Sequence, residues 1–290
     1  MSFSSDIKSR LCKTEFDCAG CRTAELAGML RFTGAAGKGE VKFLTESEEV
    51  VKRICGSICE VFGINAEFVK RARSYMIVIN DINSVENINE YLEQENLMPF
   101  ACCSASFVRG AFLGGGSISD PAKSYHMEFS TKNTDEAQLL CDILAKEGFG
   151  AKITHRKSKE IVYIKECEQI ADILGYIGAD NGALEMFTIQ VEKQMRNDIN
   201  RRVNCENANM DKSAKASSKH MQAIKTIKKS GTWEKLPEIL REIGNLREEN
   251  PDVSLKELGE MTNPPIGKSG VNHRLNRIIE IAEGMDKNNG

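Results

Sequence analysis

The chain contains an internal repeat, and this repeat restricts the fold more than any other feature of the sequence. The stretch CAGCRTAELAG at 18–28 is matched by CCSASFVRG at 102–110, and both combine cysteines with small residues. A short apolar pair and then glycine follow each stretch, at Gly34 and at 114–116. Self-similarity at a fixed spacing indicates a repeated structural unit.

The segments after each stretch repeat in the same order. An amphipathic pattern predicts a helix, and alternating β-branched and aromatic residues around a basic tip then predict a hairpin. A further helical segment closes each half. The helices are expected at 50–63 and 136–150, the hairpins at 66–80 and 151–165, and the closing helices near 83–96 and 166–177. The order occurs twice, about 85 residues apart, so we predict a duplicated α+β body with pseudo-twofold symmetry.

Small residues near the start of each half predict close helix packing. These residues are Ala27 and Gly28 in the first half and Gly110 and Ala111 in the second. Small side chains allow two helices to approach backbone to backbone, a logic best known from membrane helices. We therefore expect these two helices to meet across the pseudo-dyad.

The same two stretches resemble a known motif. LAGMLRFTG (26–34) and FVRGAFLGGGSI (107–118) are similar to the two LAGLIDADG motifs of homing endonucleases. In that family the acidic residue before the final glycine of each motif binds the divalent metal. The resemblance puts Thr33 and Gly115 at these positions, and neither provides the carboxylate that Mg²⁺ prefers.

The resemblance therefore implies a scaffold without catalytic residues, and we expect no enzyme activity. Glu25, Asp120 and Glu128 lie nearby in the sequence. We do not expect them to replace the missing ligands, because catalytic geometry tolerates little displacement.

Charge divides the chain into segments of opposite sign. Residues 1–192 carry 21 basic and 28 acidic side chains, a net charge of −7, whereas 193–230 carry 10 and 3, a net charge of +7. Residues 231–290 carry 8 and 11, a net charge of −3. The basic segment is either a solvated face or an arm that follows phosphates. We predict two halves at 1–97 and 98–192, a basic and partly helical linker at 193–230, and a small all-α domain at 231–290.

The C-terminal segment has the pattern of three short helices. Ser254 and Glu257 form a capping-box signature for the second one. In the third, an apolar face of Val271, Leu275, Ile278 and Ala282 is expected to point inward. The opposite face then exposes Asn272, His273, Asn276 and Arg277, with Arg274 at the boundary. This arrangement is typical of a helix-turn-helix that reads bases in the major groove.

Two C-terminal stretches resemble the bacterial WhiA family. They are RNDINRRVNCENANMDKSAKAS (196–217) and SLKELGEMTNPPIGKSGVNHRLNRI (254–278). Members of that family join a degenerate LAGLIDADG scaffold to a helix-turn-helix. The resemblance implies a sequence-specific transcriptional regulator of cell division or chromosome segregation, and of sporulation in spore formers.

The expected partner is double-stranded DNA. Lys268 and Ser269, at the start of the third helix, are placed to hold a phosphate. Arg201 and Arg202 in the basic segment are expected to add phosphate contacts, because the C-terminal domain itself is acidic. The basic hairpin tips predict an auxiliary DNA contact through Lys70, Arg71, Arg73, Arg156 and Lys157.

The acidic body is expected to bind another regulatory protein rather than DNA. Two alternatives remain open from the sequence. One is an active LAGLIDADG endonuclease or maturase, and the other is a protein-binding adaptor with incidental DNA contact.

Neither a metal nor another cofactor is expected. Cys18 and Cys21, with Cys12 nearby, could begin a zinc site, but four ligands are needed and no second pair has matching spacing. We interpret them, and Cys102 with Cys103, as small packed residues. The sequence has no apolar segment of about 18 residues and no apolar leader, so we expect a cytoplasmic, nucleoid-associated protein with reduced cysteines.

Overall fold

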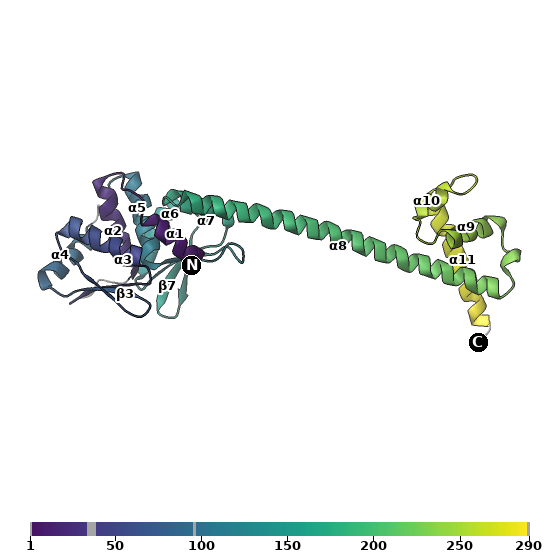
Figure 1. Ribbon diagram of the computed structural model, residues 1–290, viewed down its shortest axis with the longest axis horizontal. Helices are drawn as coiled ribbons and strands as arrows, with labels where there is room; N and C mark the ends of the chain where they lie inside the picture. The colour runs from purple at the N-terminus through teal and green to yellow at the C-terminus, as the bar shows by residue number, and fades with distance from the viewer. Residues whose placement is uncertain (1, 34–38, 95–96, 289–290) are drawn as a thin grey trace. The chain divides into compact units, whose positions relative to one another are not determined.

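The computed structural model of the chain describes residues 2–33, 39–94 and 97–288 (Figure 1). Contacts divide it into two compact units, Met1–Met195 and Arg196–Gly290. Gly34, the expected last glycine of the first motif, lies outside the described residues. Each unit has a hydrophobic core of its own.

The first unit begins with helix α1 and then runs through two similar series of elements, the second with one additional strand among the described residues. The first series is α2 (Ala19–Thr33), β1 (Val41–Thr45), α3 (Glu48–Phe62), β2 (Phe68–Lys70), β3 (Tyr75–Ile79) and α4 (Ile82–Leu92), after α1 (Phe3–Leu11). The second is α5 (Ala101–Gly115), β4 (Gly116–Ile118), β5 (Met127–Thr131), α6 (Thr134–Lys146), β6 (Lys152–Arg156), β7 (Lys159–Ile164) and α7 (Cys167–Tyr176). The predicted duplication, with a hairpin in each half, is confirmed.

Each half contains one antiparallel sheet. The strand order is β1-β3-β2 in the first half and β4-β5-β7-β6 in the second. The hairpins predicted at 66–80 and 151–165 are β2-β3 and β6-β7, with Phe68 opposite Ile77 and Thr154 opposite Ile161. Local signals fix the helix ends: Ser47 caps α3 by accepting from the Val50 amide, and Gly63 ends it in the left-handed conformation at φ 70°.

Helices α2 and α5 pack backbone against backbone, as the small residues predicted. A Cβ added at Gly28 would lie 2.3 Å from the Phe107 carbonyl oxygen, and one added at Gly110 would lie 2.0 Å from that of Glu25. Neither distance is compatible with a side chain. The helix pair therefore requires glycine at both positions.

In the part of the second unit that the structure describes, all the regular elements are helices. They are the C-terminal part of α8 (Asp180–Lys229), η1 (Trp233–Lys235), α9 (Glu238–Glu249), α10 (Leu255–Glu260) and α11 (Lys268–Asn288). The segment 183–229 contains neither proline nor glycine, so nothing in it interrupts a long helix. None of the described helices is apolar enough over a sufficient length to cross a membrane.

The basic segment at 193–230 is more structured than the predicted linker. Residues 193–229 lie within α8, so the segment is helical almost throughout. Its last turns also belong to the C-terminal core, where Ala223, Ile224 and Ile227 pack with Trp233 of η1.

The glycine contacts make a direct prediction for stability. Gly110→Ala should destabilise the first unit by about 3 kcal/mol or more, because the new Cβ overlaps the backbone of α2. Gly56→Ala in α3 is the matched control: nothing lies within 4 Å of its added Cβ, so it should be neutral or stabilise by about 0.5–1 kcal/mol. Urea unfolding measures both changes. Equal effects of the two substitutions would contradict the packing argument.

Candidate nucleic-acid interface

Helix α11 has one buried and one exposed face. Val271, Leu275 and Ile278 are fully buried, and Ala282 is 5% exposed. On the opposite face the side chains reach solvent. The exposed ones are Asn272, His273, Asn276 and Arg277, and Arg274 is half-buried at the edge. The predicted division of this helix into two faces is confirmed.

The preceding helix and turn hold α11 in place. The Glu257 amide donates to Ser254 Oγ (3.3 Å), and the Ser254 amide donates to Glu257 Oε2 (2.9 Å), so the capping box of α10 is formed. After α10, the Ile266 amide donates to the Gly259 carbonyl oxygen at 2.9 Å. A Cβ at Gly259 would lie 2.1 Å from the Ile266 carbonyl oxygen, so only glycine permits this tight turn. Two helices and the turn between them thus form a helix-turn-helix.

The start of α11 suits an anion. Lys268 and Ser269 are its first two residues, and both are exposed. The first amides of a helix have no partner within the helix and carry positive partial charge. Lys268 adds a full positive charge at the same end.

The two arginines of the exposed face already have acidic neighbours. Arg274 Nη1 lies 3.9 Å from Glu242 Oε2 of α9, and Arg277 Nη1 lies 2.7 Å from Glu280 Oε2. Both pairs are solvent-accessible, and such pairs are worth only about 0–1 kcal/mol. A base or phosphate can therefore replace either carboxylate at small cost.

Arg201 and Arg202 are exposed on α8, and both precede Ala223, the first buried apolar residue of that helix in the C-terminal core, by more than 20 positions. Ser217, on the same helix, already contacts the C-terminal core, since its hydroxyl donates to the Pro251 carbonyl oxygen at 2.6 Å. Sixteen residues separate Arg201 from Ser217, which corresponds to about 24 Å of helix.

Other basic residues of α8 lie closer to the C-terminal core. Lys212, Lys215 and Lys219 are also exposed. The charge composition of the segment does not indicate which of its basic residues lie closest to the C-terminal core. If the whole segment had been expected to form one helix, the rise per residue would have given the distance of each basic residue from the C-terminal core.

The basic hairpin tips are exposed as predicted. Lys70, Arg71 and Arg73 lie at the β2-β3 turn. Arg156 and Lys157 lie at the β6-β7 turn, where Lys157 has a φ of 57°.

Thr33 and Gly115, where the motif resemblance predicts metal-binding carboxylates, have no acidic side chain. The Thr33 hydroxyl donates to the Met29 carbonyl oxygen at 2.8 Å and so remains within its own helix. At Gly115 an added Cβ would lie 2.5 Å from the carbonyl oxygens of both Phe32 and Ser130. A side chain cannot be added at Gly115 without moving the backbone.

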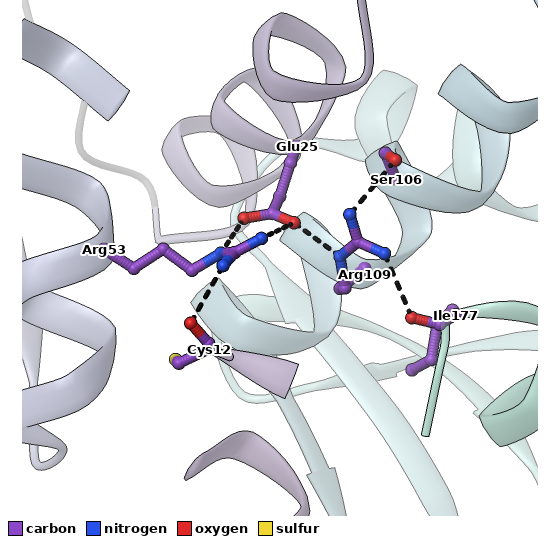
Figure 2. A network of polar contacts seen from close by, with 6 residues as sticks. All are labelled: Cys12, Glu25, Arg53, Ser106, Arg109 and Ile177. Carbon is purple, nitrogen blue, oxygen red and sulfur yellow. Dashed lines mark hydrogen bonds and ion pairs between the residues drawn. The ribbon is translucent and has the colours of Figure 1, made fainter. Parts of the chain in front are cut away.

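Of the carboxylates considered from the sequence, Glu25 is fully buried and bound by two arginines (Figure 2). It accepts from Arg53 Nη2 at 2.9 Å and from Arg109 Nε at 2.5 Å. Arg53 also donates to the Cys12 carbonyl oxygen at 2.9 Å, and Arg109 to that of Ile177 at 3.3 Å. Two guanidinium groups and full burial leave Glu25 unavailable to a metal, and its role is to join α2, α3 and α5.

The other two carboxylates also have partners. Glu128 accepts from the Ser117 hydroxyl at 3.2 Å and lies 3.2 Å from His126 Nε2. Asp120 Oδ1 accepts from the Ala122 amide at 2.9 Å.

These features define a class of protein: a LAGLIDADG-like scaffold followed by a helix-turn-helix domain. The chain matches the WhiA LAGLIDADG-like domain over 35–98 and 104–196, and the WhiA C-terminal HTH domain over 199–282. It belongs to the WhiA family.

Similar proteins span the whole chain. "Probable cell division protein WhiA" of Alkaliphilus metalliredigens is 38% identical over 98% of both chains, and that of Thermoanaerobacter sp. is 39% identical over 98% of both. The crystal structure of full-length DUF199/WhiA from Thermatoga maritima superposes with a TM-score of 0.62, at 27% identity and 98% coverage of both chains.

A buried histidine in the C-terminal core predicts acid sensitivity. His220 is 3% exposed, and its Nδ1 has no hydrogen-bond partner within the described ranges. Burial, with the charge of Arg247 as a smaller cause, lowers the pKa of His220 from 6.5 to about 4. The unfolded chain therefore takes up a proton first as pH falls. Stability should be full above about pH 6.5 and decline toward pH 4.

His220→Met should remove part of this decline, because methionine fills similar space and does not titrate. Thermal unfolding of both proteins at pH 7 and pH 5 measures the difference. An equal loss of stability in the two proteins would show that other groups cause the acid response.

Proposed function

We propose that this protein is a sequence-specific DNA-binding transcriptional regulator that acts in cell division or chromosome segregation and, in a spore-forming host, in sporulation. The observation that supports the proposal is the exposed face of α11, where Asn272, His273, Asn276 and Arg277 lie opposite a fully buried apolar face. Its relatives named "Probable cell division protein WhiA" connect the family with cell division.

The exposed side chains suit base recognition. Asn272 and Asn276 are four residues apart, so they lie on the same side of the helix. An asparagine amide can bond adenine through two atoms, and an arginine can bond guanine in the same way. The exposed face therefore has, within about one helical turn, side chains that can recognise adenine and a side chain that can recognise guanine.

Phosphate attraction must come mainly from α8. Residues 231–290 carry a net charge of −3, whereas 193–230 carry +7. Neutralised phosphates release counterions, and this release provides most non-specific affinity. In this division of labour α11 selects the sequence, and basic residues of α8, Arg201 and Arg202 among them, add affinity for any sequence.

The division of labour predicts two kinds of mutant. Asn272→Ala or Asn276→Ala should cost about 1–3 kcal/mol on the preferred site and reduce discrimination between sequences. Arg201→Ala with Arg202→Ala should weaken binding to all sequences and lower the salt-dependence slope by about one unit per lost contact. Fluorescence anisotropy with specific and random duplexes at several salt concentrations measures both effects.

Asn245→Ala is the matched control, since Asn245 is an exposed asparagine on α9 rather than α11. It should leave affinity and discrimination unchanged. If the α11 and α8 variants lost affinity equally on specific and random DNA, the proposed division would be wrong.

We further propose that the body is a platform for another regulatory protein, with an auxiliary DNA contact at most. Its net charge of −7 opposes DNA, although the exposed hairpin tips are locally basic. Screening over about 8 Å at physiological salt lets such local patches act despite the remote charge. Alanine at Lys70, Arg71 and Arg73 in the full chain should therefore reduce affinity only slightly. A loss as large as that of the α11 variants would make the body the principal reader.

We expect no nuclease activity, because Thr33 and Gly115 occupy the positions of both metal-binding carboxylates. Supercoiled plasmid incubated with the full chain and Mg²⁺ or Mn²⁺ should remain supercoiled on a gel. Metal-dependent nicking that co-purifies with the protein and disappears in an Asp120→Ala or Glu128→Ala variant would establish the endonuclease alternative instead.

A further inference from the structure

Four cysteines from the two halves of the body meet at one point. Cys18 and Cys21 lie at the start of α2, and Cys102 and Cys103 lie in the first turn of α5. Their four sulfur atoms all lie within 4.8 Å of one another. Spacing in the sequence predicts only two separate pairs of packed residues, whereas the structure brings them together because α2 and α5 begin at the same end of the helix pair.

The distances match the edges of a metal-thiolate tetrahedron. Cys18 Sγ lies 3.5 Å from Cys21 Sγ, 3.7 Å from Cys102 Sγ and 3.8 Å from Cys103 Sγ. Zinc binds thiolate at about 2.3 Å, so sulfurs at the corners of a tetrahedron around it are about 3.8 Å apart. A disulfide would require about 2.05 Å, and all four cysteines are free.

We propose that Cys18, Cys21, Cys102 and Cys103 bind one Zn²⁺ as a structural site that joins the two halves of the body. Each thiol releases its proton to solvent as its sulfur binds the metal, so the site gains four zinc-sulfur bonds for four protons lost. Four thiolates without a free position for water are typical of structural rather than catalytic zinc.

The surroundings favour a single compact ion. Both cysteine pairs lie at helix N-termini, where the positive partial charge of the amides stabilises thiolate. An iron-sulfur cluster needs a wider cradle, since its own iron and sulfide atoms separate the cysteines. The CAGC loop is correspondingly tight: a Cβ added at Gly20 would lie 3.0 Å from Cys103 Sγ.

The site also has access to solvent. Cys21 and Cys103 are fully buried, whereas Cys18 and Cys102 are half-buried. Cys18 lines a surface pocket together with Phe16, Arg22 and Glu60. Metal can therefore enter past Cys18, and the two buried sulfurs hold it from the inner side.

The location of the cysteine cluster at one end of the α2-α5 helix pair indicates which part of the structure a bound metal would stabilise. The helix pair is held along its length by the contacts at Gly28 and Gly110 and by the Glu25 ion pairs. The cysteine cluster fastens its N-terminal end and links residues 84 positions apart in the sequence. Removal of the metal should therefore loosen the junction of the two halves rather than the C-terminal domain.

Elemental analysis of the full-length protein, purified without chelator from zinc-supplemented cells, tests the proposal. We expect about one zinc per chain, and four of the ten cysteines should resist a thiol reagent until a strong chelator is added. Chelation should also lower the melting temperature. Cobalt substitution should give the visible absorption of a tetrahedral tetrathiolate site.

Two variants make the test specific. Cys103→Ser should lose the zinc, whereas Cys59→Ser, which removes an exposed cysteine outside the cluster, should keep it. If Cys103→Ser fails to fold, the metal content and thiol protection of the unaltered chain still show whether the zinc site exists. Metal-free protein with ten reactive thiols, a disulfide within the cluster, or an iron chromophore in place of zinc would each overturn the assignment.

Discussion

The close approach of α2 and α5 is the constraint on which the rest of the body depends. Gly28 and Gly110 each lie against a carbonyl oxygen of the opposite helix, at distances that exclude any side chain. Because the two helices begin the two halves, this contact also fixes the pseudo-dyad. The Glu25 network and the cysteine cluster both straddle the same helix pair, so their geometry exists only if the helices pack in this register.

The same packing bears on Gly115, where the motif resemblance predicts a metal-binding carboxylate. Gly115 packs between the carbonyl oxygens of Phe32 and Ser130, so an aspartate there would require the backbones to separate. Replacing this glycine alone would therefore not fit a carboxylate into the present packing. Glu25, the buried carboxylate of the pair, is committed to two arginines, and removing one partner of such a buried ion pair typically costs about 3–5 kcal/mol.

The repeat, the hairpins and the two faces of α11 could be predicted because each depends on local periodicity or on self-similarity. Val271, Leu275 and Ile278 follow helical spacing, and their burial identifies the exposed face directly. The cysteine cluster could not be found by spacing rules, because its pairs lie 84 residues apart and meet only through helix packing. The repeat already aligned Cys18 with Cys102, and combining that alignment with the predicted helix contact would have brought the pairs together.

For the basic segment too, the sequence predicts only part of what the structure shows. Composition identified 193–230 as positively charged, but it gave no distance between a given arginine and the helix-turn-helix. The structure adds that distance: α8 carries Arg201 about 24 Å along its axis from Ser217, which contacts the C-terminal core. On DNA this is about seven base pairs at 3.4 Å per step, well beyond the Debye length of about 8 Å at physiological salt. Under the proposed function, a phosphate contact of Arg201 and the base contacts of α11 therefore fall on separate parts of a DNA site.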